Sequence, residues 1–374
     1  MKTIYTILLL SSFNAFAVEV ADCGAIVNDG IDDTQAIMTC SQIAVDNQQI
    51  LHFPGGQYDV TGLTGLSKMH WHGDGVGLTT IRLMDNSNQT MLKSIDPDNE
   101  DVTIDGIRFD GNRANNTSGN GLVLNGVSMH LENIVVQNIA QTGIITTGYK
   151  QKNLKSGGFL GYFQNITIDQ TGKHGWCHQG PSDSSFNTIS IIDSGLSKNN
   201  TYFGMYLAKG DGNGRFFNFH YWNHNFTSSI PNAAMYVDSG GNNFTSSHFE
   251  GGYTPLVVAG NGNTFESSSY YAPRGAYSII MAGSANLLNG TIGLGHASSN
   301  AHYSGIYLYG FGNIINLING GGADKFGIDF SADHGNNIVN FTGYQPTGSA
   351  YIGIPNKTDV VNIMMTGINS RLIQ

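Results

Sequence analysis

The sequence is poor in charge, in cysteine and in long apolar runs. Charged side chains make up 12% of the 374 residues, and 27 acidic residues outnumber 17 basic ones, which gives a net charge of −10. A nucleic-acid partner is therefore not expected, because contacts with phosphates need a basic face. No stretch reaches the roughly 18 uninterrupted apolar residues of a membrane-spanning helix, so we expect no membrane partner either.

Glycine and aromatic residues are abundant by contrast. The chain has 50 glycines, 17 tyrosines and 19 phenylalanines. Glycine together with many Asn, Ser and Thr residues is typical of turns, and the aromatic residues argue against a disordered low-complexity chain. The composition favours a folded, β-rich protein.

The amino terminus has the pattern of a secretory signal. Residues 1–17, MKTIYTILLLSSFNAFA, contain a lone Lys2, an apolar run from Ile4 to Leu10 and small residues before an expected cleavage after Ala17. We therefore expect a secreted or periplasmic protein. Export favours a disulfide between Cys23 and Cys40. The third cysteine, Cys177, has no evident partner and is expected to be a buried free thiol.

From about residue 100 the chain repeats one short phrase. The spacing between equivalent positions varies from 20 residues (Ser246 to Glu266) to 32 residues (Asn133 to Asn165). Between these phrases a second short strand recurs, as in GLVLNG (121–126) and GIYLYG (305–310). The phrases include VTIDGIRFDGN (102–112), HLENIVVQN (130–138), YFQNITIDQ (162–170), RFFNFHYWN (215–223), NFTSSHFEGG (243–252) and NIVNFTGY (337–344).

Repeats of this kind predict a solenoid. Each unit holds short strands with period-2 alternation and no helical periodicity, and units of this length must stack to bury a core. We predict an all-β fold, a right-handed parallel β-helix of about 11–12 coils. Residues 18–374 would form one domain, with residues 18–60 as the amino-terminal cap and first coil.

The opening of the mature chain carries a family resemblance. Residues 32–45, DDTQAIMTCSQIAV, place Ile37, Cys40 and Ile43 or Ala44 on one helical stripe, which predicts a short capping α-helix. The run DCGAIVNDGIDDTQAI, followed by LHFPGGQYDV and MHWHGDGVGLTTIRL, resembles the start of the pectate-lyase-type, phage-tailspike-like β-helix superfamily. One departure is Gly55, where that family has a second proline. The aspartates of this opening are therefore expected to shape the fold and not to bind a metal.

The resemblance implies work on extracellular carbohydrate by a lyase, a hydrolase or an isomerase. By its size and export signal the chain is similar to biofilm-matrix polysaccharide lyases of the Vibrio type. The fold alone does not determine the reaction.

Stacked coils bring outward residues into columns, because equivalent positions in successive coils lie about 4.8 Å apart. Titratable and aromatic side chains gather in two columns along the repeated phrase, as at a sugar-binding site. These columns contain Arg108, His220 and His248, and Asp110, Trp222, Glu250 and Tyr270.

The second strand and the turns add further candidates. Tyr206 and Tyr236 occupy one column, and Asp238 follows two residues later. A glycine-rich turn carries further charged side chains, and His174 is expected to face a groove while its neighbour His178 points inward. The turn contains Lys209, Asp211 and Arg215.

These residue types fit two chemistries. A lyase acting on a uronic-acid glycoside needs a base, an acid and a positive partner for the carboxylate. In that hypothesis His220 or His248 is the base, Tyr206 or Tyr236 is the acid, and Lys209 with Arg215 or a bound Ca²⁺ meets the carboxylate. The substrate would also contact Glu250, Asp238, Asp211, Trp222, Tyr270, His174, Arg108 and Asp110.

A glycoside hydrolase is the alternative, since it needs two carboxylates about 5 Å or about 6.5–9.5 Å apart. Glu250 with Asp110, Asp211 or Asp238 would supply them. A third alternative is a matrix protein that only binds glycan through its aromatic column. We favour β-elimination on an acidic bacterial exopolysaccharide by a monomeric enzyme.

Overall fold

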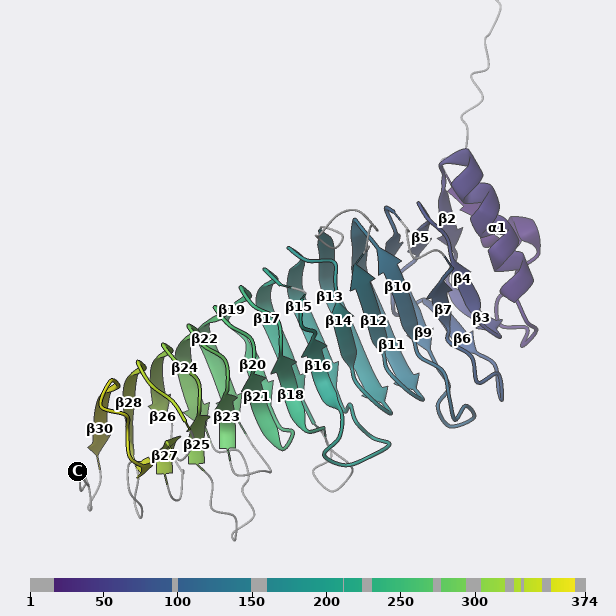
Figure 1. The fold of residues 1–374 in the computed structure, drawn as a ribbon. Helices are drawn as coiled ribbons and strands as arrows, with labels where there is room; N and C mark the ends of the chain where they lie inside the picture. Colours follow the sequence, from purple (N-terminus) through teal and green to yellow (C-terminus); the bar gives the residue numbers. More distant parts are fainter. Residues whose placement is uncertain are drawn as a thin grey trace, which may run out of the picture.

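The computed structural model shows a stack of parallel coils (Figure 1). Within the described part of the chain every strand pairing is parallel, and no helix is long and apolar enough to cross a bilayer. The expected signal sequence lies outside the described residues except for Ala17. The structure describes residues 17–95, 100–148, 160–210, 212–223, 231–271, 277–293, 304–319, 326–330, 333–344 and 351–366.

Two sheets run the length of the stack, and the parallel β-helix prediction is confirmed. A sheet of 12 strands has one strand for each coil, which agrees with the expected coil count. Its strands are β4 (Leu63–Gly65), β7 (Leu92–Ser94), β10 (Leu122–Gly126), β12 (Ile144–Gly148), β14 (Trp176–Gln179), β16 (Phe203–Leu207), β18 (Ala233–Val237), β21 (Thr254–Val258), β23 (Tyr277–Met281), β25 (Ser304–Leu308), β27 (Phe326–Phe330) and β29 (Tyr351–Gly353).

The other sheet has 18 strands, because some coils contribute two short strands and others one long strand. Its strands are β1 (Ala17–Glu19), β2 (Ile50–Phe53), β3 (Gly56–Val60), β5 (His70–Gly73), β6 (Thr79–Leu83), β8 (Thr103–Asp105), β9 (Arg108–Asp110), β11 (Met129–Ile139), β13 (Gly161–Thr171), β15 (Ser185–Ile192), β17 (Arg215–Trp222), β19 (Asn243–Thr245), β20 (His248–Glu250), β22 (Thr264–Tyr271), β24 (Leu287–Gly293), β26 (Ile314–Asn319), β28 (Ile338–Tyr344) and β30 (Val360–Thr366).

A left-handed residue divides each strand of the larger sheet in the middle coils. Asn133 in β11 has φ of 49°, and Asn218 in β17 has φ of 56°. At Asn133 the alternation of buried and outward residues slips by one position, so two successive side chains point outward. The strand therefore changes direction there, and we name the half before this corner face 1 and the half after it face 2. The 12-stranded sheet is face 3.

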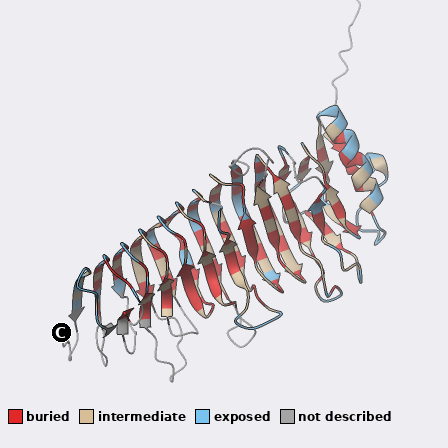
Figure 2. Cartoon of the chain, viewed as in Figure 1, coloured by how far each residue is buried: buried red, intermediate tan, exposed pale blue. Residues whose placement is uncertain are grey.

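Buried residues recur along the strands of both sheets (Figure 2), and their side chains form the core between the three faces. Phenylalanines stack from coil to coil: the Phe186 and Phe216 ring centroids are 4.1 Å apart, and those of Phe216 and Phe244 are 4.3 Å apart. Phe265 continues the row at 4.5 Å from Phe244. Identical inward residues on successive coils thus build the core along the solenoid axis, and each ring is buried by its two neighbours.

Helix α1 (Thr34–Asn47) lies across the amino-terminal end of the stack (Figure 1). Its buried stripe contains Ile37, Cys40 and Ala44, whereas Ile43 is 40% exposed. A disulfide joins Cys40 to Cys23 of the 3-10 helix η1 (Val20–Cys23). The helix is therefore tied to the segment that leads into the first coil.

A ladder of buried asparagines supports the turns of the later coils. In each coil the side-chain oxygen accepts hydrogen bonds from the backbone N–H and the side-chain amide of the asparagine in the preceding coil. The side-chain amide also donates to a backbone carbonyl, as from Asn286 to Gly260 at 3.2 Å. Every polar atom of the ladder is thus used inside an otherwise apolar stack. Its members are Asn242, Asn263, Asn286, Asn313 and Asn337.

Replacing one rung should destabilise the protein. In Asn286→Ala the backbone N–H and side-chain amide of Asn263 lose the oxygen that they contact at 2.8 and 3.1 Å. We expect a loss of about 2–4 kcal/mol in the free energy of unfolding, since buried donors are left unsatisfied. Urea denaturation measures it, with the exposed Asn187→Ala as control at roughly 0.5 kcal/mol or less. Equal effects from both variants would contradict a structural role for the ladder.

Candidate active site

Two histidines meet on face 2. His220 of β17 and His248 of β20 are register partners on adjacent coils, and their ring centroids are 5.8 Å apart. The Nε2 atom of His220 lies 3.8 Å from Oε2 of Glu250, and the Trp222 ring centroid is 6.2 Å from that of His220. The structure therefore brings together the imidazoles, the indole and the carboxylate that the sequence columns predicted.

The environment of His220 keeps its imidazole neutral. Partial burial lowers the pKa of His220 below 6.5, and the neighbouring His248 lowers it further, while Glu250 acts in the opposite direction. An imidazole with a lowered pKa is free of its proton near neutral pH and can accept one from a substrate. His248 is the more exposed of the pair and faces solvent.

The prediction that Tyr270 contacts substrate is wrong. Tyr270 is fully buried and pairs with the inward Phe249, because the register of β22 shifts between Phe265 and Ser268. The left-handed corner in this coil is Ser267, one residue after Glu266, the position that the comparison of the repeated phrases predicted. Tyr271 is the outward residue, and it pairs with Glu250.

The Tyr271 ring lies flat along the face toward the next coil. An added Cβ at Gly293 would collide with atoms Cδ1 and Cε1 of Tyr271, so the ring covers this glycine. Tyr271 therefore points away from the histidine pair, and the coil of Glu250 separates it from Trp222, so it offers a second aromatic surface. A sugar can stack on such a surface.

The structure does not bring the predicted tyrosine acids to the histidines. Tyr206 and Tyr236 are register partners on the 12-stranded sheet, and their rings are 5.7 Å apart. The hydroxyl of Tyr206 donates to Asp238 at 3.4 Å. Burial first and then Asp238 raise the pKa of both phenols. These three residues thus form a separate group on face 3.

The predicted cationic turn is also apart from the histidines. Arg215 begins β17 on face 1, before the corner at Asn218, whereas His220 follows that corner. Lys209 lies exposed in the turn that precedes β17. Asp211 lies outside the described residues. A change of face within one strand therefore separates groups that are only five residues apart.

His174 packs with the aromatic residues of face 3. Its ring stacks on Phe203 with centroids 5.4 Å apart, and its Nδ1 accepts a hydrogen bond from the Phe203 N–H at 3.0 Å. Burial, with a smaller effect of Lys173, lowers the pKa of His174 to about 4. His174 is accordingly a neutral, half-buried acceptor. The inward prediction for His178 is confirmed, since that residue is 2% exposed.

The His174 environment predicts an acid sensitivity. Between its ordinary pKa of 6.5 and the folded value of about 4, the unfolded chain binds a proton that the folded chain does not. The free energy of unfolding should therefore fall by about 2–3 kcal/mol as the pH drops through this window, and be unaffected by His174 above it. Urea melts of the wild type and His174→Gln at several pH values measure the difference. A constant gap between the two proteins across the window would contradict the prediction.

The carboxylates on face 2 are too far apart for a hydrolase pair. Asp110 and Glu250 occupy the same column but are separated by five coils, about 24 Å at the usual strand spacing. Asp169 is three coils from Glu250, or about 14 Å. Paired-carboxylate hydrolysis needs about 5–9.5 Å. Glu250 with Asp110 cannot act as such a pair, and Asp238 stands on another sheet.

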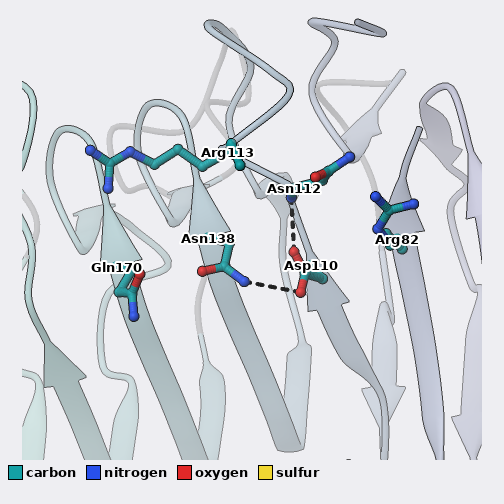
Figure 3. A pocket seen from close by; sticks show the side chains of 7 residues that line it. Arg82, Asp110, Asn112, Arg113, Asn138 and Gln170 are labelled. Atoms are coloured by element: carbon teal, nitrogen blue, oxygen red, sulfur yellow. Dashed lines mark hydrogen bonds between the residues drawn. The ribbon is translucent and has the colours of Figure 1, made fainter. Parts of the chain in front are cut away.

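Arg108 and Asp110 lie beside a cavity at the amino-terminal part of face 2. They make no direct pair, because Gln137 bridges them: its oxygen accepts from Arg108 Nη1 at 3.4 Å, and its amide donates to Asp110 Oδ2 at 2.8 Å. The adjoining cavity has a volume of about 480 Å³ (Figure 3). Its lining residues are Arg82, Asp110, Asn112, Arg113, Ala114, Asn138 and Gln170.

Among the described residues, no group of three or more His, Cys, Asp or Glu side chains is arranged to hold a metal ion. A Ca²⁺ ion bound beside the histidine pair of face 2 would therefore need oxygen ligands from the substrate as well as from Glu250.

Solved structures show the same architecture. The A-module of a mannuronan C-5 epimerase from Azotobacter vinelandii superposes with a TM-score of 0.61 at 14% identity, covering 94% of this chain and all of that one. A second such A-module from the same organism gives 0.56 at 15% identity, with the same coverage. The Dettilon tailspike protein gives 0.55 at 12% identity, covering 94% of this chain and 68% of that one. The chain has the fold of the parallel β-helix proteins. No protein-family model and no curated protein sequence matches it.

The β-helix also carries a row of charged residues on face 1 that the sequence columns missed. His52 lies between Glu19 and Asp74, at 2.9 Å from each, and Asp105 accepts from His72 at 3.0 Å. The two imidazole rings stack with centroids 5.8 Å apart. The sequence did contain a signal for this row: the alternation in LHF (51–53) and HWH (70–72) predicts that both histidines point outward. Each has a carboxylate partner, which is typical of ion pairs that order a surface.

Proposed function

We propose that this protein is an enzyme that cleaves an acidic extracellular polysaccharide by β-elimination at the histidine pair of face 2. The observation that carries the proposal is the geometry of His220 and His248. One imidazole is held neutral by its surroundings and its exposed neighbour is 5.8 Å away. The absence of a second carboxylate within hydrolase distance along the described column of Glu250 favours elimination over hydrolysis.

The two imidazoles divide the chemistry between them. His220 removes the proton at C5 of a uronate residue, and the electrons of that bond form the C4–C5 double bond as the C4–O4 bond breaks. His248 in its protonated form gives its proton to the departing O4 and offsets the negative charge of the uronate carboxylate. Glu250, 3.8 Å from His220, orients the base, and Trp222 and Tyr271 carry the neighbouring sugars.

The fold, the disulfide and the amino-terminal signal also support a proposal for the substrate and the location of the enzyme. We propose a bacterial exopolysaccharide of the biofilm matrix as the substrate, with export through the amino-terminal signal and action as a monomer. The disulfide between Cys23 and Cys40 supports an oxidising compartment outside the cytoplasm. The fold shared with polysaccharide-modifying enzymes supports a long carbohydrate as the ligand.

Inversion at C5 is a second candidate, because it begins with the same proton removal. The observation that favours it is the likeness to two proteins named as mannuronan C-5 epimerases. In that reaction the proton returns to the opposite side of C5 and the chain stays intact.

One assay separates these activities. The purified protein is incubated with a panel of uronate-containing polysaccharides, with Ca²⁺ and with a chelator, and the ultraviolet absorbance of unsaturated uronate is followed together with reducing ends. Both signals rise together in the proposed reaction. Reducing ends without absorbance would show hydrolysis and overturn the proposal. Neither signal, with deuterium from heavy water found at C5, would show epimerisation instead.

A further inference from the structure

We infer that the cavity around Arg113 is a binding subsite for an acidic sugar residue, separate from the histidine pair. It lies at the amino-terminal part of face 2, between strands β6, β9, β11 and β13 (Figure 3). A volume of about 480 Å³ falls within the roughly 300–1,000 Å³ of sites that bury small ligands. The inference rests on the proposed function only in taking the ligand to be a polymer that runs along face 2.

Arg113 is the cation available to a ligand. Arg82, on the other side of the cavity, already contacts Asp59 and Asp85 at 3.2 Å each. Within the described residues no ion pair holds the Arg113 guanidinium, which extends across the cavity toward Gln170 in Figure 3. In a chain of net charge −10 an uncompensated guanidinium at a cavity stands out, and it offers a bidentate contact to a carboxylate.

Asp110 is the carboxylate in the cavity lining, and its oxygens are engaged by neighbouring groups. Its Oδ1 accepts from the Asn112 N–H at 2.8 Å, and its Oδ2 accepts from Gln137 at 2.8 Å and from Asn138 at 3.0 Å. Both oxygens of Asp110 thus contact donors within the protein, and the last contact fixes the Asn138 amide in place. The Asn138 oxygen remains directed away from Asp110 and can accept from a sugar hydroxyl (Figure 3).

The lining repeats from coil to coil. Asn112, Asn138 and Gln170 all have left-handed backbone angles, with φ of 48°, 54° and 56°. Asn138 and Gln170 are register neighbours on successive coils, so their amides lie about 4.8 Å apart. The Asn112 amide is occupied elsewhere, since it donates to Leu83 and Asp85 and accepts from Asn115. Two amides beside one free guanidinium suit a hydroxylated sugar that carries a carboxylate.

The cavity is also placed for a long ligand. Five coils, about 24 Å, separate Asp110 from Glu250 beside the histidine pair. A polymer that reaches both sites would be anchored at the cavity, away from the bond that is cleaved at the histidine pair. Short oligosaccharides would occupy one site or the other.

The test compares acidic sugars with neutral forms of the same sugars. Oligomers of galacturonate, mannuronate and glucuronate, and their methyl esters, are titrated calorimetrically against the wild type, Arg113→Gln and Lys198→Gln. Lys198 is exposed in the turn after β15, so its change removes the same charge elsewhere. We expect at least one acid oligomer to bind the wild type about tenfold or more tightly than its ester, Arg113→Gln to weaken that preference severalfold and Lys198→Gln to retain it in full.

The outcomes separate this inference from the proposed function. Absence of any acid preference in the wild type, or an undiminished preference in Arg113→Gln, overturns the subsite. Loss of the preference in Arg113→Gln supports it even if no oligomer or polymer is cleaved, in which case the proposed reaction fails alone. Calorimetry with His220→Ala should show an unchanged acid preference, because that change lies four coils away.

Discussion

His220→Ala lowers the turnover number for polysaccharide cleavage about a thousandfold, within the 10²–10⁴ range of a lost general base. The alanine leaves the sheet intact, because the His220 side chain points outward from β17. Polymer binding should change little, since Trp222 and Tyr271 remain. Initial rates and binding isotherms on the same polymer separate the two effects.

His130→Ala is the matched control, since it removes an exposed outward imidazole from face 1. Its turnover should stay within about twofold of the wild type, because changes remote from the chemistry are usually small. In the wild type, kcat/KM should fall toward acid with an apparent pKa below 6.5, the direction set by burial and His248. Full activity in His220→Ala would place the chemistry elsewhere on the solenoid.

Phe244→Ala costs about 3–5 kcal/mol in the free energy of unfolding. Its ring is buried between Phe216 and Phe265 in a stack that runs through the coils, so the truncation leaves a cavity with aromatic walls on both sides. Neighbouring coils cannot close that cavity without shifting their own register.

Phe217→Ala is the matched control, because Phe217 follows Phe216 in the chain but is 55% exposed. It should change the free energy of unfolding by roughly 0.5 kcal/mol or less. Chemical denaturation of both variants, with circular dichroism to confirm folding, gives the comparison. Equal losses would mean that the inward row does not dominate the stability of the stack.

The solenoid and the inward and outward alternation could be predicted from the sequence. A repeat that must stack to bury a core leaves few other architectures. The columns also placed His220 next to His248, because both follow a left-handed corner by two residues. One extra residue in β22 was enough to exchange Tyr270 for Tyr271, since strand side chains alternate with a period of two.

The division into three faces could not be predicted from the columns. Arg215 and His220 share a strand, yet Asn218 turns the chain between them. Tyr206 and Tyr236 form a column of their own on the smaller sheet. Periodicity reports which residues point outward, but only the angle between faces decides which outward groups meet.

Of the residues at the Arg113 cavity, the sequence columns indicated only Asp110. The lining comes from four successive coils, and its corner residues looked like ordinary asparagine-rich turns. Their role depends on which charges are already paired, and this is a property of the folded chain.

Mass spectrometry of the products formed in heavy-oxygen water tests the central claim most directly. Removal of the C5 proton by His220 predicts an unsaturated uronate at one new end and no heavy oxygen carried in by the cleavage, and His220→Ala should form about a thousandfold less of both products in the same time. Heavy oxygen at the new reducing end, above the amount that an uncleaved oligosaccharide takes up by anomeric exchange in the same time, would show that water breaks the glycosidic bond and would contradict the account.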